Sequence, residues 1–213
     1  MSTRIREYPA GTTPRRATPG DFFLTEEAEF GSHRVQRMLA AVASKFVHVG
    51  GHIWFGDDDC ARWAHAGMVV EPNGAIIEAN PRGVGKTHLS KYHDKNIAVI
   101  HPDVTDEQRH LAVQAAYAQL GRPYDFLKLL ALVINGICGF SLTAGLDHHD
   151  ICSELVARCT EKYIVGYDSN IPNVSPPAIA KEWNVQSSQP APTHNIIDSA
   201  IETLSLIRKV MHI

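Results

Sequence analysis

The clearest helical pattern of apolar and polar positions covers residues 106–120. Apolar side chains recur there at intervals of three and four residues, which is the spacing of one face of an α-helix. Thr105 and Gln108 have the spacing of a capping box at its start. Gly121 followed by Pro123 is typical of a helix end. Similar patterns predict three further helices, over residues 32–47, 151–163 and 195–211.

Four short apolar segments have the composition of β-strands. Residues 20–24 predict the first strand, and residues 96–101, rich in Ile and Val, predict the last. Residues 64–70 and 75–79 flank the turn sequence EPNG at 71–74, so they are predicted to form a hairpin. Because helices and strands are not regularly alternated, we expect an α+β fold in which a small antiparallel sheet packs against helices.

Both ends of the chain differ in composition from its middle. Residues 1–19 are rich in Thr, Pro and Arg without periodicity, and they predict a disordered N-terminal arm. Residues 20–165 hold the patterned segments and predict the folded domain. Residues 166–213 start with a stretch rich in Pro, Ser and Asn and end with the amphipathic helix. They are predicted to form a C-terminal extension that packs on the domain.

Composition and charge narrow the class of protein. The 213 residues suffice for one domain with a sizeable core, and 44% apolar and 20% charged residues are ordinary for a globular protein. A net charge of −3 gives no overall field that would attract nucleic acid. Four cysteines are too few for a disulfide framework, and the N-terminal charges are not followed by the apolar run of a signal peptide. We therefore expect a cytoplasmic protein with reduced thiols.

Cys152 is the first candidate for chemistry. Asp150 is predicted to cap a helix, which places Cys152 in the first turn. The unpaired N–H groups and the dipole of a helix start favour a thiolate there. A cysteine at such a position is more often a small buried apolar residue. Cys159, two turns later, lacks the dipole and is expected in the core.

His65 and Glu78 are the candidates to activate that thiol. In the predicted strand His65 shares a face with Gly67 and Val69, a position at which a histidine is more often structural. Glu78 lies between apolar residues of the next strand, and a buried carboxylate needs a partner. The hairpin brings Glu78 within reach of His65 if the register allows it.

Five short motifs occur in order along residues 20–165: GDFFL at 20–24, HAGMV at 65–69, IEA at 77–79, GRPYDF at 121–126 and CSELV at 152–156. In this order they resemble the circularly permuted papain-like amidases of the NlpC superfamily, the YaeF/YiiX type. That family has its histidine and polar residue before the cysteine. The resemblance implies a circularly permuted papain-like, NlpC-type fold and a bacterial or phage origin. It also implies a cysteine hydrolase that cleaves an amide bond, of a cell-wall-derived or other peptide, or an ester bond through an acyl-enzyme.

The same resemblance implies roles for individual residues. Cys152 would be the nucleophile, His65 the general base and then acid, and Glu78 the third, orienting residue. The Cys152 N–H and Tyr124 would stabilise the oxyanion, with Ser153 in the same substrate-binding set. Neither a metal nor an organic cofactor is implied. Two departures from the family are Ile151, where an aromatic residue is common, and a longer loop at residues 50–62.

Two other functions stay open from the sequence. Residues 129–146 carry no charge and contain several glycines, so they predict a buried helix and an apolar loop more than a membrane span. They would suit an acyltransferase or thioesterase acting on a lipid-like acyl substrate. The other function is a non-catalytic binding protein that uses the N-terminal arm and C-terminal helix as contact surfaces. The expected partner is a small-molecule, peptide or lipid-like acyl substrate, with neither nucleic acid nor an integral membrane span.

Two further motifs are weaker. Residues 80–87, NPRGVGKT, end like a phosphate-binding loop, but Asn80 replaces its first glycine and Pro81 stiffens it. They predict a turn that enters a surface helix. Residue types that bind zinc also occur without the paired spacing of a zinc site. They are Cys60, His65, His148, His149, Asp150 and Cys152.

Overall fold

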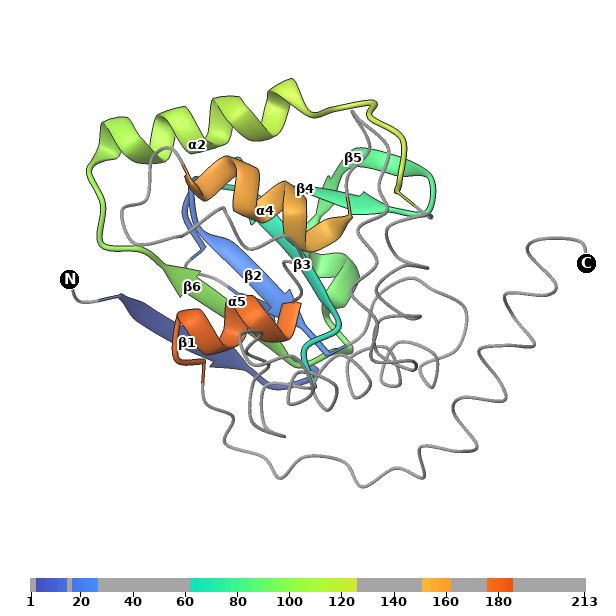
Figure 1. Ribbon diagram of the computed structural model, residues 1–213. Coiled ribbons are helices and arrows are strands. Elements are labelled where there is room, and N and C mark those ends of the chain that lie inside the picture. The colour runs from blue at the N-terminus through green and yellow to red at the C-terminus, as the bar shows by residue number, and fades with distance from the viewer. Residues whose placement is uncertain (1–2, 15–16, 27–61, 126–150, 162–175, 186–213) are drawn as a thin grey trace, which may run out of the picture.

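A six-stranded antiparallel sheet forms the centre of the fold in the computed structural model (Figure 1). The structure describes residues 3–14, 17–26, 62–125, 151–161 and 176–185. The strands are β1 (Arg4–Tyr8), β2 (Phe22–Thr25), β3 (His65–Val69), β4 (Ala75–Asn80), β5 (Gly83–His88) and β6 (Ile97–His101). Their order across the sheet is β1-β6-β2-β3-β4-β5. The two central strands, β2 and β3, are therefore buried on both faces.

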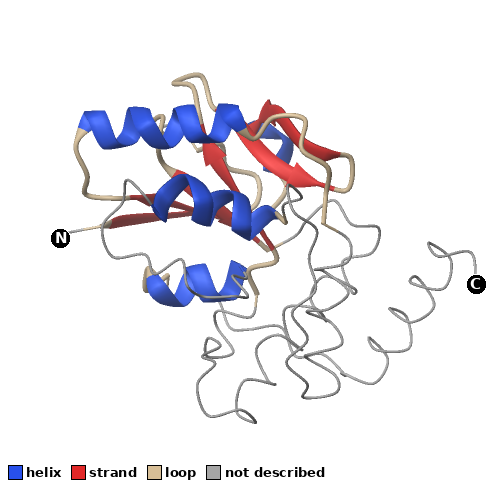
Figure 2. Ribbon diagram, turned by 45° about the horizontal axis from the view of Figure 1, so that its top comes forward, coloured by secondary structure: helices blue, strands red, loops and turns tan. Residues whose placement is uncertain are grey.

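Three α-helices of the described part of the chain cover one face of the sheet (Figure 2). They are α2 (Asp106–Ala118), α4 (Cys152–Glu161) and α5 (Pro176–Glu182). The short 3₁₀-helix η2 (Leu89–Tyr92) packs on the opposite face. Helix α4 contacts β3 and β4, so its first residue is placed close to the central strands.

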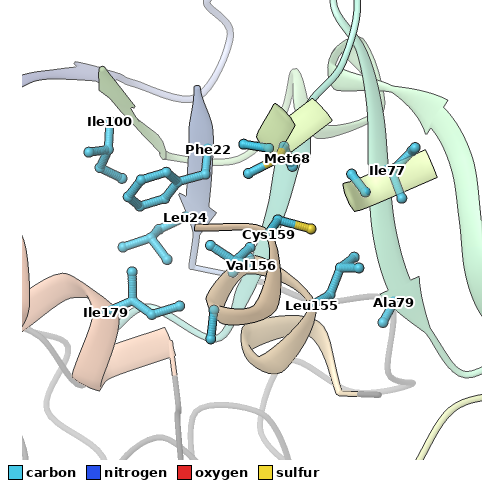
Figure 3. Close-up of a cluster of buried hydrophobic side chains, with 14 of the residues drawn as sticks. Phe22, Leu24, Met68, Ile77, Ala79, Ile100, Leu155, Val156, Cys159 and Ile179 are labelled. Carbon is cyan, nitrogen blue, oxygen red and sulfur yellow. The ribbon is translucent and has the colours of Figure 1, made fainter. Parts of the chain in front are cut away.

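The larger hydrophobic core lies between the sheet and the helices (Figure 3). Phe22 and Leu24 of β2 point into it, together with Leu155 of α4 and Ile179 of α5. A smaller cluster on the other face joins Phe23 to η2. Adjacent residues of β2 thus serve opposite faces, as the two-residue period of a strand requires.

The α+β prediction is confirmed, as are several of its elements. The strand pattern at 96–101 corresponds to β6, the hairpin at 64–79 to β3 and β4, and the helix pattern at 151–163 to α4. Thr105 and Gln108 form the predicted capping box at the start of α2, with each side chain bonded to the other's backbone N–H. These features depend on neighbours in the sequence, which is why the sequence predicts them.

The prediction of a disordered arm over residues 1–19 is wrong where the structure describes it. Residues 4–8 form β1, which pairs with β6 along its whole length. Ile5 packs against the core on the helix side of the sheet, and Tyr8 packs on the opposite side. Charged residues between them hide the alternation. The strand is stabilised by hydrogen bonds to a segment some ninety residues away, which local composition does not indicate.

The prediction of a turn entering a surface helix at 80–87 is also wrong. Residues 83–88 form strand β5, paired with β4, and η2 follows. Lys86 makes an ion pair with Glu71 on the neighbouring turn, so it serves the sheet and not a phosphate-binding loop. Only the first two residues of β5 are buried, which explains its weak apolar signal.

Other sequence predictions lie outside the described residues. They are the helices at 32–47 and 195–211, residues 50–61 of the loop predicted at 50–62, and the apolar stretch at 129–146. Part of the predicted C-terminal extension lies within the described residues. Its helix α5 packs on the core through Ile179 and Ala180. Within the described ranges, no helix has the length and apolar character needed to cross a bilayer.

Candidate active site

His65 and Glu78 meet on one face of the sheet. In the β3–β4 ladder Met68 lies opposite Ile77, and continuing this register places Gly67 opposite Glu78. His65, two residues before Gly67, therefore shares a face with Glu78 and lies diagonal to it. Both side chains are buried, and His65 Nε2 lies 3.0 Å from Glu78 Oε2. The register thus makes the contact that the hairpin pattern allowed.

The His65 ring packs against two aromatic side chains, which also contact each other. Phe23 of β2 approaches it edge-on at 6.3 Å between ring centroids, and Tyr92 of η2 lies at 5.8 Å. Gly67 makes room for this arrangement, because a Cβ at that position would lie 2.6 Å from the Phe23 ring. The glycine of the HAGMV motif is therefore explained by packing beside the histidine.

Cys152 lies in the first turn of α4, as predicted, but α4 begins at Cys152 itself, one residue later than the predicted start at Ile151. Leu155 N–H donates to Ile151 C=O at 3.1 Å, so the first helical residue is Cys152, the one that follows Ile151. The first backbone N–H groups of a helix have no intrahelical acceptor and favour a negative charge. The Cys152 side chain is 7% exposed and is within hydrogen-bonding reach of the His65 ring. Since Glu78 occupies Nε2, the ring nitrogen left for the thiol is Nδ1.

Cys159, in the same helix, lies in the larger hydrophobic core (Figure 3). It is fully buried among the apolar residues between α4 and the sheet. The expectation that this second cysteine lies in the core is confirmed.

His65 and Glu78 carry charges of opposite sign. Burial by itself lowers the pKa of His65, but the charge and hydrogen bond of Cys152 and the contact with Glu78 outweigh it and raise the pKa to about 10. Burial by itself raises the pKa of Glu78, but His65, Lys91 and Tyr92 outweigh it and lower the pKa to about 2. At neutral pH the pair is therefore an imidazolium and a carboxylate, with the imidazolium beside Cys152.

Lys91 and Tyr92 are site residues that the sequence reasoning missed. Lys91 Nζ donates to Glu78 Oε1 at 2.5 Å, and Tyr92 Oη donates to Glu78 Oε2 at 2.5 Å. Both belong to η2, in the stretch expected to be a surface helix. A buried carboxylate predicts a cation nearby. No spacing rule, however, identifies a lysine thirteen residues further along the chain.

Tyr124 is buried close to Cys152. Burial raises its pKa well above the usual value, and the charges of Cys152, Asp125 and Glu154 raise it further. The phenol therefore keeps its proton and can donate a hydrogen bond. Its segment is attached to β5, because Val84 N–H donates to Arg122 C=O at 2.8 Å.

Ser153 is fully buried in the first turn of α4. A role for its side chain in substrate binding or at the oxyanion stays a prediction. Its backbone N–H is one of those near the helix start that lack an intrahelical acceptor.

The described residues contain no group of three His, Cys, Asp or Glu side chains arranged to hold a metal ion. Most of the residues considered for zinc lie outside the described ranges, namely Cys60, His148, His149 and Asp150. His65, the remaining histidine of that set, is engaged by Glu78 and Cys152.

The chain matches a known protein family. The model of the permuted papain-like amidase enzymes of the YaeF/YiiX type, the C92 family, matches residues 44–174. A search of curated proteins found no match. The matched segment includes the contact between His65 and Glu78 and the start of α4.

Proposed function

Since the chain belongs to the permuted papain-like amidases of the YaeF/YiiX type, we propose that it hydrolyses an amide or ester bond through an acyl-enzyme on Cys152. The single observation that carries this proposal is the row of side chains Cys152, His65 and Glu78. They are a nucleophile at a helix start, an imidazole within its reach and a carboxylate that holds the ring. This is the arrangement that activates a thiol. We also assign the fold to the NlpC type of papain-like proteins.

In the acylation step the Cys152 thiolate attacks the substrate carbonyl. A C–S bond forms, and the negative charge moves to the carbonyl oxygen, where the Cys152 N–H and the Tyr124 hydroxyl are proposed to donate. His65 then gives its Nδ1 proton to the leaving amine or alcohol as the C–N or C–O bond breaks. The products are the free leaving group, a thioester on Cys152 and a neutral His65.

In the deacylation step His65 acts as a base. The thioester sulfur carries no charge, so one of the groups that raise the pKa of His65 is absent in the acyl-enzyme. Neutral His65 accepts a proton from water while the water oxygen bonds to the carbonyl carbon. The C–S bond then breaks, which releases the acid and restores the thiolate and the imidazolium. Glu78 accepts a hydrogen bond from Nε2 in both steps.

Acyl transfer to an amine or alcohol, or cleavage of a thioester, would use the same Cys152 intermediate. The apolar stretch at 129–146 that favours a lipid-like acyl group lies outside the described residues, so hydrolysis is the function we propose. A purely binding role would not need a thiol, an imidazole and a buried carboxylate in contact.

The reactivity of Cys152 toward iodoacetamide tests the activated thiol. An ordinary cysteine, with a pKa of about 8.5, reacts on the order of 10²-fold more slowly at pH 6 than at pH 9. The proposed mechanism uses a Cys152 thiolate beside the His65 imidazolium, so we expect Cys152 to react at rates within a few-fold of each other at these two pH values. Mass spectrometry of the labelled peptides measures the rate for each cysteine.

The matched variant is His65→Ala, in which Cys152 should recover the pH dependence of an ordinary thiol. Cys159 is the internal control, since it is buried in the core and should react only when the protein unfolds. A Cys152 that is as slow at pH 6 as an ordinary cysteine would contradict the proposed function.

Tyr124→Phe is expected to lower kcat for a p-nitrophenyl acetate probe by about 10- to 10²-fold, with a smaller change in KM. The phenol donates to an oxygen that becomes negative only in the transition state, so its loss affects the rate more than the binding. Tyr117→Phe is the control, because that hydroxyl donates to Glu71 away from the site. Equal activity of the two variants would exclude Tyr124 from the oxyanion site.

A further inference from the structure

The Glu78 carboxylate has more partners than the orientation of one histidine requires. It is fully buried, and three side chains contact its two oxygens. Oε2 receives His65 Nε2 and the Tyr92 hydroxyl, while Oε1 receives Lys91 Nζ. Lys91 is 23% exposed, so its charge is partly solvated whereas that of Glu78 is not.

The element that supplies Lys91 and Tyr92 is attached firmly to the sheet. Leu89 of η2 is buried, and its N–H donates to Gly74 C=O at 2.8 Å. His88 caps η2 by accepting from Ser90 N–H at 3.1 Å. The Tyr92 ring also packs against His65, and Lys91 Nζ lies 5.1 Å from the centre of the Tyr92 ring. One short helix therefore positions the cation, the hydroxyl and one wall of the histidine site.

The proposed reaction, on which this inference rests, changes the charge next to Glu78 twice in each cycle. While His65 is an imidazolium, the carboxylate has a cation at Nε2. Once His65 has given up its proton, that cation is gone, and a buried carboxylate without a compensating charge is costly. Lys91 contacts the other carboxylate oxygen, Glu78 Oε1, and does not take part in the proton transfers, so its charge is constant during the reaction.

We propose that Lys91 and Tyr92 are positioning residues that keep Glu78 ionised and fixed while His65 is neutral. The carboxylate then continues to accept the Nε2 hydrogen bond, so Nδ1 stays directed at the acyl group for the attack of water. Lys91 also opposes a positive charge on His65, which favours the neutral ring needed in deacylation. A charge-compensated Glu78 would thus serve the second half of the reaction more than the first.

Among the residues that the structure describes, the charged and titratable groups that face this pair come from three elements besides β3. For His65 they are Cys152 of α4, Glu78 of β4 and Tyr92 of η2, while Phe23 of β2 is apolar. For Glu78 they are His65 and the two η2 residues. Removing the Cys152 thiol isolates the effect of Lys91, because a neutral residue at 152 represents the uncharged sulfur of the acyl-enzyme.

The test is therefore the titration of His65 by NMR in a Cys152→Ala background, with labelled histidine and with His65→Gln to assign the signal. Replacing Lys91 by Met or Gln should raise the pKa of His65 by about one unit, because it removes a neighbouring positive charge and leaves the carboxylate uncompensated. Lys91→Arg should restore the original value. Tyr92→Phe should give a smaller rise, because only a neutral donor is lost.

Lys86→Met is the matched control, since it breaks a lysine–glutamate ion pair on the neighbouring strand and should leave His65 unchanged. Gln keeps a hydrogen-bond donor at position 91, so this variant is available if Met prevents folding. An unchanged His65 pKa in both variants would overturn the inference, because a merely structural Lys91 would alter stability alone. The titration uses the Cys152→Ala background, which lacks the proposed nucleophile. Its result therefore does not depend on whether the chain is a hydrolase.

Kinetics separates the two proposals. With p-nitrophenyl acetate, Lys91→Gln should keep the burst of acylation, while the acid limb of the steady-state rate moves up by about the same one unit. A burst in the wild type without that shift would leave the proposed function intact and reject the role of Lys91. A His65 titration shift in a chain that neither hydrolyses the probe nor reacts with iodoacetamide would reject the hydrolase instead.

Discussion

Cys152→Ala is expected to lower hydrolysis of p-nitrophenyl acetate by about 10⁴-fold or more while the protein stays folded. The substitution removes the atom that bonds to the acyl group, and loss of the nucleophile in a triad-type site has effects of this order. Its effect on stability should be small, because the side chain lies at the start of α4 and is not fully buried. Steady-state kinetics and thermal unfolding together measure the two effects.

Cys159→Ala is the matched control in the same helix. It removes a fully buried thiol from the core, so it should lower stability by about 1 kcal/mol and leave the rate nearly unchanged. The double variant Cys152→Ala/His65→Ala should lose no more activity than Cys152→Ala, because the two residues act as one unit. Activity retained by Cys152→Ala would contradict the proposed acyl-enzyme.

Glu78→Gln is expected to lower kcat by about 10³- to 10⁴-fold. The amide nitrogen can donate to His65 Nε2 and so favour the ring tautomer that lacks a lone pair toward the acyl group. The pKa of His65 should also fall from its value of about 10, because a negative charge that stabilises the imidazolium is removed. The basic limb of the acylation rate, which requires the imidazolium as acid, should therefore move to lower pH. Pre-steady-state kinetics across pH measures both changes.

Glu71→Gln is the control for this substitution. That carboxylate lies on the turn before β4, is partly exposed, and bonds to Lys86 and Tyr117. The same chemical change there should leave kcat within about two-fold, since exposed ion pairs contribute little. If Glu78→Gln kept more than a tenth of the activity, Glu78 would be a structural residue and not the orienting one.

The sequence by itself determined the features that depend on neighbouring residues. The capping box of Thr105 and Gln108 requires only three residues of spacing, and the turn at 71–74 favours a tight hairpin. The place of Cys152 at a helix start follows from local periodicity in the same way. Together with the order of motifs, these features were sufficient to predict an α+β fold and the family.

The tertiary structure decided what depends on long-range pairing and burial. Strand β1 exists because β6 offers it a partner, although its own sequence is largely charged. Strand β5 is stabilised by β4 in the same manner. An edge strand with one poorly buried face has little apolar alternation, so its residues do not identify it.

The environment of Glu78 shows the same division. The sequence placed a carboxylate in an apolar strand and near His65, but the register of β3 and β4 decided that the two touch. Only the fold of β5 back onto β4 brings η2, and with it Lys91 and Tyr92, to the same carboxylate. The physical reason is that a buried charge is compensated by groups that are close in space, which can be far apart in the sequence. Sequence periodicity, in contrast, indicates only which face of an element is apolar.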